Sequence, residues 1–386
     1  MTKISPRKID LRSLRLSPEE GFVLSRVDAP MSLEELSAVS GLGEDRVLEI
    51  VENLARQGAV DVEGILIPEL TPPPQPAPVP SAPPPSIGPI DELEDVAESE
   101  AVALAVAGVC DVGKARSNNE DAMAVADLTD KGVLEGLGAR CAIDVGARGV
   151  LLAVSDGMGG ENAGEVASAM VLETMNAYLR DHDPSDDPAA TLAAAVNEAN
   201  AKVMAAAEQR ELSGMGATLI AFLVTGGSAI TAEIGDSRAY VLRQGNLTQL
   251  SKDQTHVGLL VAQGILKPED AKKSRAKNVI LQACGKLPEL VVAQRSFPVR
   301  RGDRLLLCSD GLTLHVEDRE IEEVLVSVAS PDEASAKLVA MANERGGKDN
   351  VTVLVANVEG AAPPAGPDDS IESAVTVVRE FGPGAE

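Results

Sequence analysis

The pattern of apolar and polar positions changes little between Val102 and Val358, where short apolar runs are separated by Gly and Asp. These runs predict β-strands. Four stretches instead repeat apolar residues at helical spacing: 163–178, 192–206, 321–328 and 333–344. Runs of strands followed by pairs of helices favour an α+β layered sandwich over a doubly wound parallel sheet.

The first 70 residues show a different pattern, with three short helical stretches. One follows Ser17, one begins at the capping-box residue Ser32, and one runs over 44–57 with Val47 and Leu54 on its apolar face. The alternation over 59–67 is typical of a small β-wing. This region therefore resembles a winged helix-turn-helix, and we expect residues 1–70 to form a winged-helix-like docking module.

A linker separates these two patterns. Proline occupies nine of the eighteen positions in 71–88, and acidic residues dominate 91–100. Such a segment favours an extended, semi-rigid spacer. We therefore expect a linker over 71–100, one large domain over 101–358, and a disordered tail over 359–386, which is rich in Ala, Pro, Gly and acidic residues.

Composition narrows the possible partners. The chain of 386 residues carries a formal net charge of −26, only 2% of its residues are aromatic, and residues 1–70 contain 8 basic and 13 acidic side chains. This charge repels phosphate backbones, so we expect no nucleic-acid partner, even for the winged-helix-like module. No apolar run approaches the length of a membrane span, and the four dispersed cysteines are typical of reduced core residues. We expect no membrane partner and a cytoplasmic location.

Acidic residues stand repeatedly at the ends of the predicted strands. They are Asp121, Asp156, Asp236, Asp310 and Asp349. Carboxylates gathered beside buried strands would be costly without cations, and all-oxygen ligands select hard ions such as Mg²⁺ or Mn²⁺. Glycines beside two of these residues, in 156–160 and 309–312, allow sharp turns and offer backbone carbonyls as further ligands.

Six motifs in order resemble the metal-dependent Ser/Thr protein phosphatases of the PPM (type 2C) family. They are Gly113-Lys-Ala-Arg-Ser-Asn-Asn-Glu-Asp121, Asp156-Gly-Met-Gly-Gly160, Gly214-Met-Gly-Ala-Thr218, Gly235-Asp-Ser-Arg238, Ser309-Asp-Gly-Leu312 and Lys348-Asp-Asn350. The resemblance implies an αββα four-layer sandwich with a binuclear metal centre at one end of its two sheets.

The resemblance also implies roles for individual residues. It assigns Asp121, Asp156, Asp310, Asp349 and the carbonyl of Gly157 to two Mn²⁺ or Mg²⁺ ions, with Glu120 acting through water. It gives Arg116 the task of clamping the substrate phosphate, and it makes Asp236 a possible ligand of a third metal ion. The implied reaction is hydrolysis of phosphoserine and phosphothreonine by a hydroxide that bridges the two ions.

Three positions depart from the family pattern. Met158 stands where many relatives have a His proposed as the general acid, although many bacterial members share the Met. Leu314 replaces the usual acidic partner of the third-metal residue, which argues against a third ion. Gln254 replaces the His of an Asp-His-Ser or Asp-His-Thr motif.

Phosphorylated proteins are the expected substrates, and the enzyme would oppose a Ser/Thr kinase. An alternative reading makes the chain a phosphoprotein-binding regulator with weak or no turnover. The complete set of Asp residues favours the enzyme over this alternative.

Overall fold

The structure is a computed structural model that divides into two compact units, Met1–Asp91 and Glu92–Glu386. It describes residues 3–6, 23, 27, 31–32, 36–37, 44–56, 60–63, 101–130, 132–133, 140–159, 163–267, 270, 274 and 279–382. The linker predicted over 71–100 lies outside these residues. Of the helix predicted after Ser17, they include Val23, which is helical and buried.

The described part of the first unit contains a small sheet and the helix α3 (Glu44–Arg56), and residues 23, 36 and 37 are also helical. The strands β1 (Lys3–Pro6), β2 (Met31–Ser32) and β3 (Val60–Glu63) form a sheet in the order β2-β1-β3. Val47, Ile50, Val51 and Leu54 are buried, which confirms the predicted apolar face of this helix. The first strand of the predicted wing is present as β3, but it pairs with β1, a strand that sequence analysis missed.

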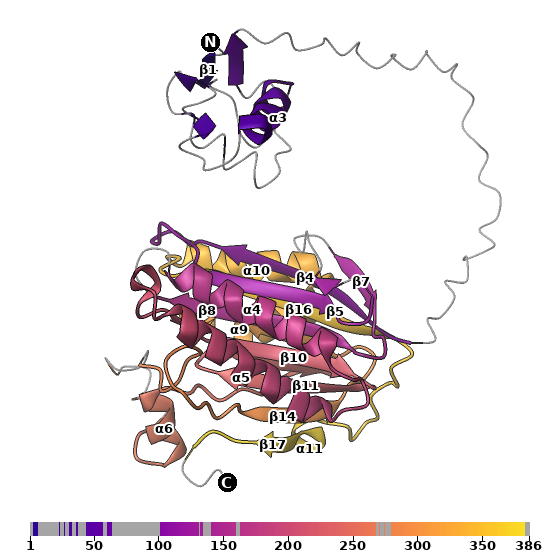
Figure 1. Ribbon diagram of the computed structural model, residues 1–386. Coiled ribbons are helices and arrows are strands. Elements are labelled where there is room, and N and C mark those ends of the chain that lie inside the picture. The colour runs from indigo at the N-terminus through magenta and orange to yellow at the C-terminus, as the bar shows by residue number, and fades with distance from the viewer. Residues whose placement is uncertain are drawn as a thin grey trace, which may run out of the picture. The chain divides into compact units, whose positions relative to one another are not determined.

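The second unit holds most of the described secondary structure (Figure 1). Its strands are β4 (Val102–Asp111), β5 (Asp121–Asp127), β6 (Gly132–Val133), β7 (Cys141–Asp144), β8 (Val150–Met158), β9 (Gly216–Ala217), β10 (Leu219–Thr225), β11 (Ser228–Ile234), β12 (Arg238–Arg243), β13 (Asn246–Gln249), β14 (Gln294–Pro298), β15 (Arg304–Cys308), β16 (Val351–Gly360) and β17 (Thr376–Arg379). Its helices are α4 (Ala163–Asp181), α5 (Pro188–Ala206), α6 (His256–Ala262), α8 (Asp310–Thr313), α9 (Asp318–Ser327), α10 (Pro331–Glu344) and α11 (Ile371–Ala374), with a 3-10 turn at Arg210–Leu212.

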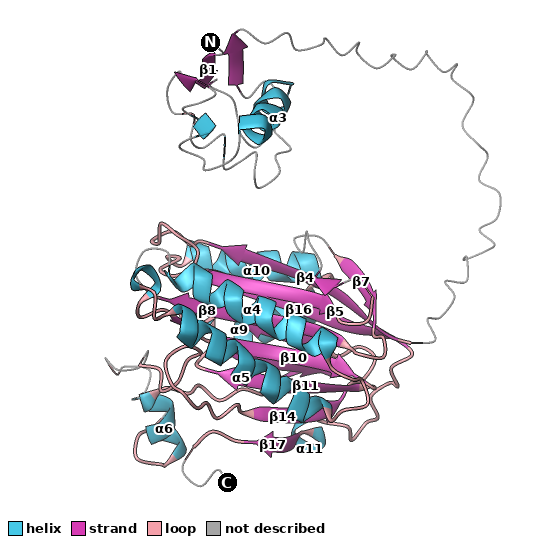
Figure 2. Cartoon of the chain, in the orientation of Figure 1, coloured by secondary structure: helices cyan, strands magenta, loops and turns pink. Residues whose placement is uncertain are grey.

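The strands form two antiparallel sheets packed face to face. One runs β17-β14-β11-β10-β8-β5-β6, with β9 attached to β8, and the other runs β13-β12-β15-β16-β4-β7. Helices α4 and α5 cover the first sheet, as Figure 2 shows, and share an apolar core with it. Helices α9 and α10 pack on the second sheet through another core, and a third core fills the space between the sheets. This arrangement confirms the αββα four-layer sandwich.

The four predicted helices are present, and local chemistry sets where two of them begin. Pro188 and Pro331 each open a helix, where a missing backbone N–H costs nothing. The Asp187 side chain caps α5 by accepting hydrogen bonds from the backbone N–H groups of Ala189 and Ala190.

The prediction of a disordered tail over 359–386 is wrong for the residues that the structure describes, which extend to Gly382. Strand β16 continues to Gly360, and β17 pairs with β14 at the edge of the first sheet. Ile371 is buried in the core between the sheets, and Asp369 accepts a hydrogen bond from the buried Arg243 at 3.1 Å. Composition alone suggested disorder, whereas these few contacts order the segment.

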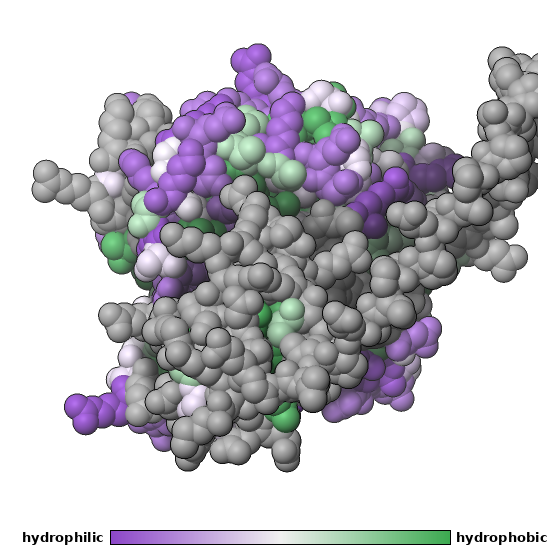
Figure 3. All heavy atoms as spheres, turned by 90° about the horizontal axis from the view of Figure 1, so that it is seen from above, coloured by the Kyte–Doolittle hydropathy of each residue, from purple (hydrophilic) through white to green (hydrophobic). Residues whose placement is uncertain are grey.

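The polarity of the surface and the burial of two of the four cysteines are consistent with this packing. On the face shown in Figure 3, the described residues are mostly hydrophilic, and hydrophobic ones form only small groups. Cys284 and Cys308 are buried, Cys110 and Cys141 are half-buried, and all four are free thiols, so the prediction of core positions holds for two of them. Within the described part of the chain, no helix has the length and apolar character needed to span a bilayer.

Candidate metal centre

Strand register brings the predicted acidic residues together. Asp121 opens β5 and lies directly opposite Asp156 of β8 in the antiparallel ladder. Gly157 follows Asp156 on β8 and pairs with Ala217 of β9. Two carboxylates that are 35 positions apart in the chain therefore become cross-strand neighbours, a few ångströms apart.

The second sheet contributes the other carboxylates at the same end of the sandwich. Asp310 begins α8, two residues after Cys308 ends β15, and Asp349 precedes β16 by two residues. Cys308 pairs with Val353 of β16 and with Arg238 of β12, so the ends of these strands meet. Asp236 lies in the turn that leads into β12. All five acidic residues therefore come together, as the sequence predicted.

Crowding of these carboxylates in a buried place changes their acidity. Burial, followed by repulsion from Asp236, raises the pKa of Asp310 to about 8. Burial also raises the pKa of Asp121 to about 6, and burial with repulsion from Asp121 raises the pKa of Asp156. Concentrated negative charge of this kind favours the binding of cations.

One oxygen of Asp121 is held in place while the other has no partner. The hydroxyls of Ser309 and Thr352 each donate a hydrogen bond of 2.7 Å to Oδ2. Oδ1 is buried and has no hydrogen-bond partner among the described residues. A buried carboxylate oxygen without a donor is costly, and a cation would satisfy it.

Backbone packing explains the glycine that follows Asp156. A Cβ atom on Gly157 would lie 2.0 Å from the carbonyl oxygen of Gly164 and 2.7 Å from that of Glu120. The Gly157 N–H donates to this Glu120 carbonyl at 3.0 Å, and the Ser168 hydroxyl donates to it at 2.7 Å. Helix α4 and the end of β8 thus fix the backbone before Asp121.

Arg116 and Glu120 lie in the loop between β4 and β5, at the edge of the acidic cluster. The Arg116 side chain is 48% exposed, with Nη2 3.0 Å from Asp349 Oδ1 and Nη1 3.6 Å from Glu120 Oε2. The structure therefore brings the predicted phosphate clamp to the predicted metal ligands, with its side chain still accessible from solvent.

Asn350 organises this loop, although sequence analysis assigned it no role. Its Oδ1 accepts the Glu120 N–H at 2.8 Å, and its Nδ2 donates to the carbonyls of Val112 and Asn118 at 3.0 and 2.9 Å. Asn350, Ser309 and Thr218 all belong to the motifs quoted above, so a signal was present for these supporting residues. Thr352 lies outside every motif and carried no such signal.

A cavity of about 660 Å³ adjoins the acidic cluster. Asp236, Asp310 and Leu314 line it, together with Asp253, which also contributes to raising the pKa of Asp236 to about 6 after the larger effect of burial. Nε and Nη2 of Arg238 donate hydrogen bonds to the two carboxylate oxygens of Asp253, at 2.8 and 2.7 Å. Leu314 offers no ligand here, as the sequence indicated.

The donor set fits hard divalent cations, because every candidate ligand is an oxygen and Asp121 Oδ1 has no other partner. The side chains are not arranged as a finished cage. In the described ranges, no three His, Cys, Asp or Glu side chains are already grouped at ligand spacing. The carboxylates would have to rotate toward a bound ion.

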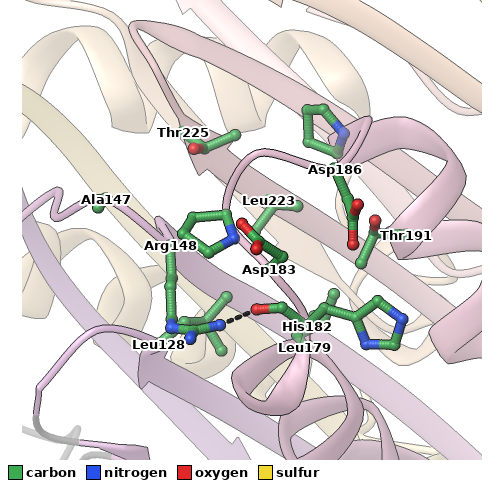
Figure 4. Close-up of a pocket in the computed structure, with 12 residues that line it drawn as sticks. Leu128, Ala147, Arg148, Leu179, His182, Asp183, Asp186, Thr191, Leu223 and Thr225 are labelled. Atoms are coloured by element: carbon green, nitrogen blue, oxygen red, sulfur yellow. Dashed lines mark hydrogen bonds between the residues drawn. The ribbon is translucent and has the colours of Figure 1, made fainter.

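A second cavity, of about 30 Å³, lies at the opposite end of the first sheet (Figure 4). Its Arg148 precedes β8 and donates to the carbonyl of His182, as the dashed line shows. The His182 ring stacks on Tyr178 with centroids 4.1 Å apart. Arg148 and Asp156 are separated by roughly 25 Å of strand at about 3.3 Å per residue, so this cavity is not part of the acidic cluster.

Comparison with known proteins places the site in a family context. The sequence pattern of the family "Protein phosphatase 2C" matches residues 140–343. The serine/threonine protein phosphatase PstP of Mycobacterium tuberculosis is 40% identical over 259 residues, which cover 67% of this chain and 45% of PstP. This chain therefore spans about half the length of that relative. The serine/threonine phosphatase stp of Listeria welshimeri is 35% identical over 209 residues, which cover 53% of this chain and 83% of that protein.

Solved structures show the same similarity. The crystal structure of the catalytic domain of PstP in complex with two manganese ions has a TM-score of 0.56 and 37% sequence identity. The match covers 67% of this chain and the whole of that domain. The two manganese ions belong to that structure.

Proposed function

Because this chain belongs to the protein phosphatase 2C family, we propose that it hydrolyses phosphoserine and phosphothreonine in proteins in a metal-dependent reaction. One observation carries the proposal. The register of β5 with β8 and the ends of neighbouring strands gather five carboxylates at one end of the sandwich, and the buried Asp121 keeps an oxygen without a donor.

Two divalent ions, Mn²⁺ or Mg²⁺, are the proposed cofactors. Their ligands would be Asp121, Asp156, Asp310, Asp349 and the Gly157 carbonyl, with Glu120 acting through water. When bound, such ions supply positive charge for the phosphate dianion and lower the pKa of water toward neutrality. Asp236 would be available to a third ion, although Leu314 provides no second ligand.

The side chains of the protein hold and orient the substrate. Arg116 would present its planar fork to two phosphate oxygens, turning from Asp349 toward the incoming anion. Asn350 holds the loop that carries Arg116, and Ser309 with Thr352 orients Asp121. Met158 has no proton to donate, so we assign no side chain as the general acid.

Partners and location extend this proposal. A phosphatase of this kind would oppose a Ser/Thr kinase. The module of residues 1–70, which carries more acidic than basic side chains, would bind protein partners and would not bind DNA. Four free thiols support a reducing, cytoplasmic location.

The rival function is a phosphoprotein-binding regulator with weak or no turnover. One observation favours it, since the described carboxylates are not yet grouped at ligand spacing. Conversely, the complete ligand set and the partnerless oxygen of Asp121 favour the enzyme.

Release of phosphate from an aryl phosphate and from a phosphothreonine peptide separates the two functions. We expect release from both substrates with Mn²⁺, loss of release with a chelator, and recovery when Mn²⁺ is restored. Binding of the phosphopeptide without release at any Mn²⁺ concentration would establish the regulator instead.

A further inference from the structure

Gln254 lies in a buried polar network behind the acidic cluster that the proposed mechanism does not use. Gln254 lies in the segment that follows β13 and is only 1% exposed. Its Oε1 accepts the Gly235 N–H at 2.9 Å, and its Nε2 donates to the Glu233 carbonyl at 3.0 Å. Its own backbone N–H also donates to the Gly235 carbonyl at 2.9 Å. One residue therefore binds the peptide groups on both sides of Ile234 and just before Asp236.

Gln282 sets which way this amide faces. Gln282 Nε2 donates to Gln254 Oε1 at 2.8 Å and to the Val291 carbonyl at 2.7 Å, while its Oε1 accepts the Val291 N–H at 3.1 Å. Because Gln282 presents a donor, the oxygen of Gln254 must point toward it and toward Gly235. Every polar atom of the two side-chain amides thereby has a partner.

The turn held by Gln254 is also connected to the end of β8, which carries Asp156. Gly235 has φ +101°, and a Cβ there would lie 2.7 Å from Thr218 Cγ2. The Thr218 hydroxyl accepts the Asp156 N–H at 3.0 Å and bonds the Ser237 hydroxyl at 2.9 Å. The short turn that carries Asp236 is thus clamped between Gln254 and the backbone of Asp156.

We propose that Gln254 is a positioning residue, which holds the Gly235–Ser237 turn and, through the Ser237 and Thr218 hydroxyls, the backbone of Asp156 when a cation binds at the carboxylate cluster. The proposal rests on the proposed metal-dependent function. A neutral amide suits the task because it accepts and donates at once, independently of pH. Substitution would leave the buried Gly235 N–H without its acceptor, and the turn would shift to satisfy it.

The test compares Gln254→Leu with Gln294→Leu in the full chain. Gln294 is the control for the loss of a buried side-chain amide, because it is 3% exposed and its amide donates to the carbonyl of Ala189 at 2.9 Å, outside the network. Mn²⁺ affinity is measured by calorimetry, the Mn²⁺ concentration for half-maximal phosphate release by kinetics, and stability by thermal unfolding.

We expect Gln254→Leu, which removes three side-chain hydrogen bonds, to lose more stability than Gln294→Leu, which removes one. Only Gln254→Leu should weaken Mn²⁺ binding and raise the Mn²⁺ requirement, by about 10-fold or more. Gln254→His should recover most of this loss at pH 8, because neutral imidazole again supplies one donor and one acceptor. If Gln254→Leu does not fold, Gln282→Leu takes its place in the test. We expect this variant to weaken Mn²⁺ binding by about 3-fold or more, because it acts on the turn only through Gln254.

The proposal fails if Gln254→Leu and Gln294→Leu bind Mn²⁺ with equal affinity. Where Gln282→Leu is used instead, it fails if that variant binds Mn²⁺ as tightly as the wild type. Failure of the proposed function is seen separately, as absence of phosphate release by the wild-type protein. Calorimetry still tests the positioning role in that case.

Discussion

Replacing Asn350 with Ala should separate the support of the phosphate-binding loop from the chemistry of the metal ligands. Asn350 is 4% exposed and makes three side-chain hydrogen bonds to the backbone of residues 112–120. The variant removes all three and leaves the partly buried Glu120 N–H without its acceptor. The Asn350 side chain bonds neither Arg116 nor a carboxylate, and the alanine keeps the backbone N–H that donates to Asp349 at 3.0 Å.

The magnitude follows from these bonds. At roughly 1 kcal/mol each, their loss should lower the free energy of unfolding by about 3 kcal/mol. For a unit that spans Glu92–Glu386, this corresponds to a fall in melting temperature of about 5 °C. The freed loop carries Arg116 and Glu120, so kcat/KM for a phosphothreonine peptide should fall about 10-fold, as for other residues that orient a site.

The control is Asn200→Ala. Asn200 is 2% exposed and also bridges two backbone groups, accepting the Gly285 N–H at 2.7 Å and donating to the Leu287 carbonyl at 2.9 Å. It should cost about 2 kcal/mol and leave kcat/KM within about 2-fold of wild type. If both variants keep wild-type kcat/KM, Asn350 serves stability alone and the positioning argument fails.

Four further outcomes follow from the same site and fold. Asp156→Ala should abolish Mn²⁺-dependent phosphate release while circular dichroism stays that of the wild type, and near-normal turnover would exclude Asp156 as a ligand. Arg116→Lys keeps the charge but loses the planar fork, so kcat/KM should fall about 10-fold, or about 1.4 kcal/mol; unchanged kinetics would place Arg116 outside the site. Burial raises the pKa of Glu233 from 4.5 to about 8, so the folded state holds a proton that the unfolded state releases, and this group lowers stability as pH rises from about 5 to 8. Glu233→Gln should therefore gain stability relative to wild type between pH 5 and pH 8 in urea titrations, whereas a constant difference would contradict the raised pKa. Deleting residues 361–386 exposes the β14 edge and removes Ile371 from the core, which should lower the melting temperature by about 4 °C; an unchanged melting temperature would show that the segment adds nothing.

Much of this protein follows from local patterns in the sequence. Helical periodicity predicted α4, α5, α9 and α10, since the spacing of buried positions depends on neighbours three and four residues away. The acidic residues at strand ends, such as Asp121 and Asp310, were recognisable for a similar reason. An apolar strand followed by Asp and Gly, as at Asp156 and Asp310, is a local signal, and six motifs in order indicated the family.

Tertiary structure decided how these pieces meet. The register that sets Asp121 opposite Asp156 depends on the pairing of two whole strands. The side-chain hydrogen bonds of Asn350 join residues more than 200 positions apart in the chain. Those of Gln254 join Gly235 and Gln282, which belong to separate turns. The order of the C-terminal segment likewise depends on Ile371 and Asp369 finding a core and an arginine built from distant strands. Local propensity carries no information about such contacts, because they form and stabilise the protein only once the two sheets have packed together.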